Sequence, residues 1–168
     1  MEASFLKKTK EQLHLAAVEY AKMIGCTVVV ESDDFQHQRI YRLRFSASNF
    51  LHLTGVLTGL KAHEFFEKCL NNTITCDEFS YNEYKNKTNI KKKLSCLCRI
   101  GEFFNQPIYA QEFFVKNKVA CRLATADESF TIGFANGNYC LWPQTILSKN
   151  HLDKSKTICL VNPVVLHQ

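Results

Sequence analysis

The sequence lacks the short motifs that mark several common classes of enzyme. Its six glycines are scattered and form no phosphate-binding loop, and paired acids at metal-binding spacing are missing. Asp33-Asp34 stands in a predicted turn and does not indicate a metal site. Neither a Gly-x-Ser-x-Gly elbow nor a His-Glu-x-x-His helix occurs. We therefore expect neither a metal nor a cofactor.

The eight cysteines include no Cys-x-x-Cys pair. The most closely spaced cysteines are Cys96-x-Cys98, and no second closely spaced pair occurs that could complete a zinc site. A structural zinc site is therefore not indicated. Residues 1–4 lack the basic-then-apolar plan of a signal peptide. Reduced, mostly buried thiols are therefore expected rather than disulfides.

Long apolar runs are also missing, because none approaches the ~20 residues of a membrane span. We expect a cytoplasmic protein with no membrane partner. The 168 residues, 46% hydrophobic and 22% charged, indicate a single globular domain over residues 1–168. Thirteen phenylalanines against one tryptophan predict a core filled mainly by Phe and Leu. The formal charge of +5 permits a polyanionic partner without requiring one.

Apolar periodicity predicts helices first and a run of strands later. Helices are expected over residues 4–24, 61–70 and 89–104, and a hairpin-like strand pair over 26–30 and 39–46. A capping box at Thr9 and Gln12 would start the first helix later. Residues 75–89 are expected to form an irregular loop.

An antiparallel meander is predicted for the rest of the chain. Its strands are expected over residues 108–114, 118–124, 130–134, 139–142 and 157–161. Asn136-Gly137 indicates a two-residue type I′ turn, and Pro143 would end the strand that follows. The order of elements predicts an α+β fold.

The centre of the chain is the stretch Asn49–Gly55, which follows a strand with Arg42 and Arg44 on its polar face. If the stretch is extended, His52 and Thr54 share one side, near the two guanidinium groups. Imidazole transfers protons near neutral pH, and arginine holds phosphate. The combination suits phosphodiester cleavage without a metal. A histidine with no catalytic role is the alternative, and Thr54-Gly55 is also typical of a plain helix or turn boundary.

Basic residues gather between Glu83 and Glu102, an interval with no acidic residue. They are Lys85, Lys87, Lys91, Lys92, Lys93 and Arg99, with Tyr81 and Tyr84 just before them. Lys93 stands at the edge of the apolar stripe, where it could reach into a cleft. The interval indicates either a solvated helix face or a footprint for RNA or phosphate.

Metal-free cleavage of RNA needs an acid, a base and cations for the charge on the phosphate oxygens. His52 would be the acid or base, Thr54 a hydroxyl donor, and Arg42, Arg44 and Lys93 the cations. The remaining candidates for RNA binding are basic or polar. They are Lys91 and Lys92, Arg99, and Arg122 and Thr131, which face away from the apolar residues of their strands.

At these residues the chain resembles a family of nuclease-like domains. Asn49–Gly55, followed by the Phe65-Phe66 helix, is similar to the phage-associated domains grouped with barnase, EndoU, colicin and RelE toxins, the BECR fold. The fourth phage subgroup is the most similar. The similarity continues through Lys91–Leu94 and returns at Tyr139–Pro143, so it covers most of the chain after about residue 38.

The resemblance implies an α+β domain with a metal-independent ribonuclease site, acting as a toxin, effector or processing enzyme of a phage or mobile element in its host's cytoplasm. Its motif positions point to His52 and Thr54, and less directly to Lys93. No second histidine stands at a recognisable spacing, which favours a His/Lys/Arg site over a pair of histidines. RNA is the expected partner, with an antitoxin, immunity or host-defence protein as a second.

Two other functions remain open from the sequence. A non-enzymatic module of a mobile element would use the same basic face to bind nucleic acid or to block a host-defence protein. A small-molecule or nucleotide-binding domain would instead show a deep apolar pocket.

Overall fold

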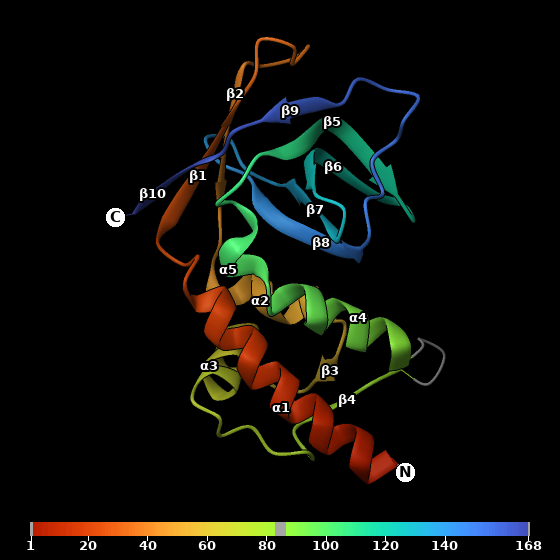
Figure 1. Ribbon diagram of the computed structural model, residues 1–168. Coiled ribbons are helices and arrows are strands. Elements are labelled where there is room, and N and C mark those ends of the chain that lie inside the picture. Colours follow the sequence, from red (N-terminus) through yellow and green to blue (C-terminus); the bar gives the residue numbers. More distant parts are fainter. Residues whose placement is uncertain (1, 83–86, 168) are drawn as a thin grey trace.

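The structure is a computed structural model that describes residues 2–82 and 87–167. Within that part of the chain, the helices gather on one side of the molecule together with the short strands β3 and β4, and the larger sheets lie on the other side (Figure 1). The helices are α1 (Glu2–Ala21), α2 (Ala47–Thr54), α3 (Ala62–Leu70), α4 (Lys87–Leu97) and α5 (Ile100–Phe103). The strands are β1 (Cys26–Glu31), β2 (Ile40–Arg44), β3 (Leu57–Thr58), β4 (Phe79–Ser80), β5 (Ile108–Lys116), β6 (Val119–Ala126), β7 (Phe130–Ala135), β8 (Trp142–Ser148), β9 (Cys159–Val161) and β10 (Val164–His167).

The strands form antiparallel sheets, which confirms the predicted α+β class. A five-stranded sheet has the order β8-β7-β6-β5-β9, so β5 to β8 form an antiparallel meander, although the strand predicted over 139–142 lies at 142–148 instead. A three-stranded sheet has the order β10-β1-β2, which contains the predicted pairing of β1 with β2. Two backbone hydrogen bonds of 2.8 and 2.9 Å join Arg42 and Arg44 of β2 to Leu141, just before β8.

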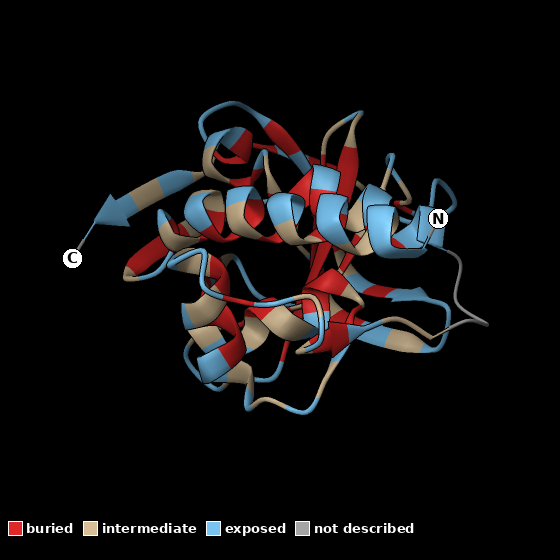
Figure 2. Cartoon of the chain, turned by 90° about the horizontal axis from the view of Figure 1, so that it is seen from below, coloured by how far each residue is buried: buried red, intermediate tan, exposed pale blue. Residues whose placement is uncertain are grey.

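Helix α1 covers the core with one face. Leu13, Ala16, Ala17 and Tyr20 are buried at helical spacing, while the outer side of the helix stays exposed (Figure 2). The Tyr20 ring packs within 6 Å of the rings of Phe45, Phe50 and Phe66. Aromatic side chains thus join α1 to the residue that follows β2, to α2 and to α3, as the abundance of phenylalanine predicts.

The N-terminal half differs from the sequence prediction at its boundaries. Helix α1 begins at Glu2, and Thr9 is a buried residue within it rather than a cap. The predicted helix over 89–104 is divided into α4 and α5, and α4 begins before Asn89. The expected loop over 75–89 contains β4 and the start of α4. Tyr84 and Lys85 lie outside the described residues.

The C-terminal half contains two corrections. The predicted type I′ turn at Asn136-Gly137 is wrong, because β7 ends at Ala135 and residues 136–141 connect it to β8. Pro143 lies inside β8, at a shift in register opposite Phe134, where the ladder is already irregular. The prediction also missed β10, which pairs with β1.

None of the described helices is both long and apolar enough to cross a lipid bilayer.

Candidate functional site

Residues 47–54 form helix α2, so the extended conformation expected for this stretch is wrong. Residues that favour a helix boundary stand at both ends of α2. The Ser46 backbone N–H donates a hydrogen bond of 3.3 Å to Asn49 Oδ1, and Gly55 ends the helix with φ of 78°. Phe50, Leu53 and Thr54 then face the core at helical spacing. These boundaries override the alternating pattern that continues from β2.

His52 lies on the opposite, outward face of α2. Ser48, Leu51, His52 and Gly55 recur at helical spacing and line one wall of a groove. The His52 side chain is exposed, so solvent and ligands reach its imidazole. Because α2 begins directly after β2 and packs against α3 and β8, the wall is held by elements from both layers of the fold.

Lys93 of α4 forms the second wall with Asn89 and Ile90. Its ammonium group donates a hydrogen bond of 3.2 Å to the Ile146 carbonyl in β8. A Cβ atom on Gly55 would come within 3.4 Å of Lys93 Cδ, so the end of α2 and α4 approach each other closely. Lys93 therefore lies between a helix terminus and the sheet, in the groove that His52 also lines.

The third wall comes from the sheet. The β5–β6 hairpin contributes Lys116 and Asn117, and β8 contributes Gln144 and Thr145. Asn117 and Lys118 have φ of 52° and 66°, the positive values that a type I′ turn requires at both central residues. The groove between the three walls has a volume of about 890 Å³. It is large enough for several groups of a ligand.

The groove is basic. Its lining within the described residues includes His52, Lys93 and Lys116 and no aspartate or glutamate. Neutral hydrogen-bonding side chains surround these three residues. They are Ser48, Thr58, Asn89, Asn117, Gln144 and Thr145. Ammonium groups and neutral donors around an imidazole can hold a phosphate and move a proton beside it.

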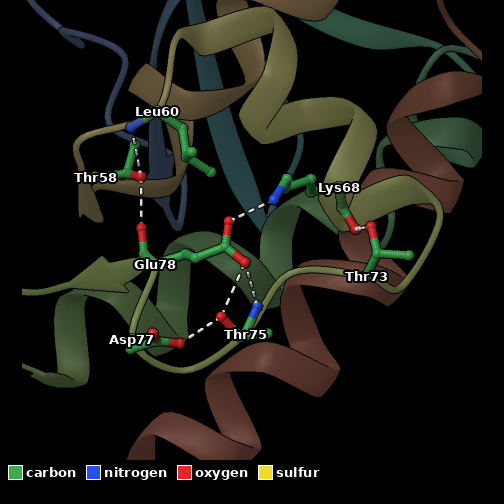
Figure 3. Close-up of polar contacts among 7 residues, drawn as sticks. All are labelled: Thr58, Leu60, Lys68, Thr73, Thr75, Asp77 and Glu78. Atoms are coloured by element: carbon green, nitrogen blue, oxygen red, sulfur yellow. Dashed lines mark hydrogen bonds and ion pairs between the residues drawn. The ribbon is translucent and has the colours of Figure 1, made fainter.

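A network of polar contacts fixes the β3 side of the groove (Figure 3). Thr58 donates a hydrogen bond of 2.6 Å to the Glu78 carbonyl and accepts one of 3.1 Å from the Leu60 N–H. The Glu78 carboxylate forms an ion pair of 2.7 Å with Lys68 and accepts hydrogen bonds from Thr75. The hydrogen bond from Lys68 holds the pKa of Glu78 below its ordinary value. The segment after α3 thus holds Thr58 at the groove.

Thr54, predicted as a hydroxyl donor, does not reach the groove. The side chain is fully buried. Its hydroxyl donates a hydrogen bond of 2.7 Å to the Leu51 carbonyl and accepts one of 3.2 Å from the Val56 N–H. Thr54 therefore fixes the C-terminal turn of α2, and through it the position of His52.

The predicted arginines do not line the groove either. Arg44 lies over the Trp142 ring, 5.9 Å from its centroid, while Arg42 is exposed on β2. Arg122 donates a hydrogen bond of 2.7 Å to Gln38, and Arg99 lies over the Phe130 ring. These contacts hold Arg44, Arg122 and Arg99 against other parts of the surface.

Three further predicted residues also fall outside the groove. Thr131 is fully buried, with its hydroxyl donating to the Lys149 carbonyl and accepting from the His151 N–H, both at 2.9 Å. It faces inward because all of β7 is buried, contrary to the expected open face. Lys91 and Lys92 are exposed on α4 but lie beyond the groove lining. Of the predicted residues, the groove brings together His52 and Lys93.

Lys116 and Asn117 are groove residues that the sequence prediction missed. A signal was present, because Asn117 lies between two predicted strands and asparagine tolerates positive φ. What the sequence does not show is where the hairpin tip points. That position depends on the tertiary packing that places the tip in one groove with residues of α2, α4 and β8.

The eight cysteines are free thiols, and none of those in the described chain lines the groove. Burial raises the pKa of Cys69 to about 12 and that of Cys121 to about 11. These two thiols stay protonated at neutral pH, so they are packing groups rather than nucleophiles. The described residues also contain no group of three or more His, Cys, Asp or Glu side chains placed to hold a metal ion.

Comparison with protein-family models gives a match over residues 12–158, to the family described as phage-Barnase-EndoU-ColicinE5/D-RelE like nuclease 4. The chain belongs to this family. Membership confirms the resemblance carried by the Asn49–Gly55 stretch and assigns the α+β domain to a BECR-type nuclease family. No curated protein and no solved structure matched the chain.

Proposed function

We propose that this member of the nuclease family is a metal-independent endoribonuclease whose site is the groove between α2, α4 and the β5–β6 hairpin. The observation that carries the proposal is the shared groove of His52, Lys93 and Lys116, lined by no described acidic residue. Such a lining attracts a polyanion and offers no carboxylate ligands for a divalent cation.

In the proposed reaction, the ribose 2′-oxygen attacks the adjacent phosphorus and the bond to the 5′-oxygen breaks. The products are a 2′,3′-cyclic phosphate and a free 5′-hydroxyl. One proton leaves the 2′-hydroxyl and one is added to the leaving 5′-oxygen; His52 takes the first or donates the second, as suits an imidazole near neutral pH, and water carries the other. Lys93 and Lys116 offset the charge that develops on the phosphate oxygens.

The groove supports this assignment by geometry as well as by charge. Lys93 is held against β8 by its hydrogen bond to the Ile146 carbonyl, which leaves its charge intact. The Thr58 side is fixed by the contacts around Glu78. A site whose charged groups are positioned before the substrate arrives spends little free energy on rearrangement in the transition state.

Non-catalytic binding of nucleic acid is the second candidate. Lys91 and Lys92 are exposed on the outer side of α4, next to Lys93 in the sequence. A protein that uses this face only for binding would hold RNA without cleaving it. Its affinity would fall steeply with salt and with the loss of all three lysines.

The two functions separate in one cleavage experiment. Wild-type protein, His52→Ala and His63→Ala are incubated with end-labelled RNA in excess chelator. His63 is an exposed histidine on α3 that pairs with Glu67 at 3.5 Å and does not line the groove. We expect wild type and His63→Ala to give 2′,3′-cyclic phosphate ends and His52→Ala to lose cleavage while keeping its fold. Binding without cleavage by the wild-type protein would favour the second candidate.

A further inference from the structure

A second cavity lies away from the groove, between the β1–β2 connection, β5 and the segment before β9. Its volume is about 450 Å³. Phe35, His37 and Phe113 line it with aromatic rings, and Glu112, Lys156 and Thr157 are also part of its lining. It shares no lining residue with the groove, so we call it the aromatic pocket.

Phe113 has an unusual conformation. Its φ is 54°, a value that is disfavoured for a bulky residue. The residue lies in β5 between the Glu112–Leu123 and Phe114–Cys121 pairs, which keep one register with β6, and Phe113 itself is not among the paired residues. Its ring is left 45% exposed at the pocket, with the His37 ring edge-on at 4.3 Å. Backbone strain that presents an apolar ring to solvent is typical of functional positions.

The His37 side of the pocket is fixed before any ligand binds. The Glu112 carboxylate accepts hydrogen bonds from Tyr41 and from the successive backbone N–H groups of residues 36–38. Partial burial acts to raise the pKa of Glu112, but these hydrogen bonds hold it below its ordinary value. Arg122 also bonds Gln38 at 2.7 Å. The β1–β2 connection is therefore tied to β5 beside Phe113.

The other side of the pocket offers hydrogen-bond donors and a cation. Gln36 Nε2 donates a hydrogen bond of 3.4 Å to Thr157 Oγ1, which links the two sides. Lys156 is exposed at the same rim. Aromatic rings and an ammonium group in the lining of one cavity match a planar base joined to a phosphate.

We propose that the aromatic pocket binds one unpaired nucleobase by stacking on the Phe113 ring, with His37 beside it and Lys156 contacting the adjoining phosphate. Phe113 and Lys116 belong to the same strand and stand three residues apart, roughly 10 Å. Along β5 the pocket and the groove are therefore separated by a distance that a single RNA strand can span. The inference rests on the proposed function only for the identity of the ligand as RNA.

The test uses the full chain carrying His52→Ala, so that RNA is not consumed. The probes are a fluorescent single-stranded RNA of six adenosines, adenosine monophosphate, and ribose 5-phosphate as a base-free control. Phe113→Gly removes the ring and permits positive φ, so the fold is retained, as a melting curve would show. Lys156→Ala removes the rim cation, and Lys154→Ala removes the same charge from a neighbouring residue outside the pocket.

We expect Phe113→Gly to weaken RNA binding roughly 5- to 100-fold, the range for loss of one base–aromatic stack. Lys156→Ala should weaken it more than Lys154→Ala. Adenosine monophosphate should bind and ribose 5-phosphate should not. RNA binding tighter than the mononucleotide would identify a strand as the ligand, and equal affinity would identify a free nucleotide; both support a base-binding pocket.

Unchanged affinity in Phe113→Gly, or ribose 5-phosphate binding as well as adenosine monophosphate, would overturn the inference. The result of this binding test can be distinguished from the result of the RNA-cleavage test of the proposed function. A wild-type protein that fails to cleave RNA, but loses nucleotide binding through Phe113→Gly, would refute the nuclease proposal and support this one.

Discussion

Replacing Thr54 by valine tests whether its hydroxyl is structural. Valine has nearly the same shape but removes the bond to the Leu51 carbonyl and leaves the Val56 N–H without an acceptor. Val56 is 7% exposed, so water compensates poorly. An unsatisfied buried donor costs about 1–3 kcal/mol. In a chain of this size that corresponds to a fall in Tm of about 2–12 °C.

The assay combines thermal unfolding followed by circular dichroism with RNA cleavage measured per folded molecule. We expect Thr54→Val to lower Tm, whereas cleavage well below Tm stays near the wild-type rate. Thr54→Ser keeps the hydroxyl and loses one methyl group, about 1 kcal/mol. The Tm of Thr54→Ser should therefore lie between the Tm of the wild type and that of Thr54→Val.

Two results would refute this reasoning. A valine variant as stable as the wild type would mean that the two hydrogen bonds contribute nothing. A stable, folded Thr54→Val that has lost cleavage, beside an active Thr54→Ser, would place the hydroxyl in the chemistry.

Two further variants probe the groove and the contacts that frame the fold. Lys93→Met should slow single-turnover cleavage about 100-fold by removing a cation from the phosphate, whereas Lys8→Met on α1 should not; equal rates would exclude a role for Lys93. The folded-state pKa values of Glu78 and Glu112 are lowered, so their stabilisation is complete above the unfolded pKa of about 4.3 and is lost as pH falls through the folded values. Urea unfolding should therefore show a decline below about pH 4 that is shallower in Glu112→Gln, and identical pH profiles would contradict this assignment.

Sequence reasoning succeeded where a helical stripe determines the position of a residue. Lys93 stands at the edge of the stripe that includes Ile90 and Leu97, and it reaches the groove as predicted. The prediction from sequence is wrong at residues 49–55. The alternation of the preceding strand suggests an extended chain there, but Ser46 and Gly55 delimit a helix. The helix boundaries at Ser46 and Gly55 outweigh the alternation of the preceding strand.

The rest of the groove depends on contacts between distant segments. Lys116 lines it together with residues of α2 and α4, and no local sequence pattern indicates that these segments meet. Thr131 faces inward because both sides of β7 are covered, which local alternation does not reveal. Arg44 turns to Trp142, almost one hundred residues away in the sequence.

The most direct measurement of the proposed chemistry is the single-turnover cleavage of a DNA oligonucleotide that carries one ribonucleotide, in excess chelator. Wild-type protein should cut only after that ribonucleotide, leaving a 2′,3′-cyclic phosphate, and His52→Ala should be slower by roughly 100-fold or more. Cleavage elsewhere in the DNA, or an undiminished rate in His52→Ala, would contradict the proposal that this imidazole acts on a ribose hydroxyl in the basic groove.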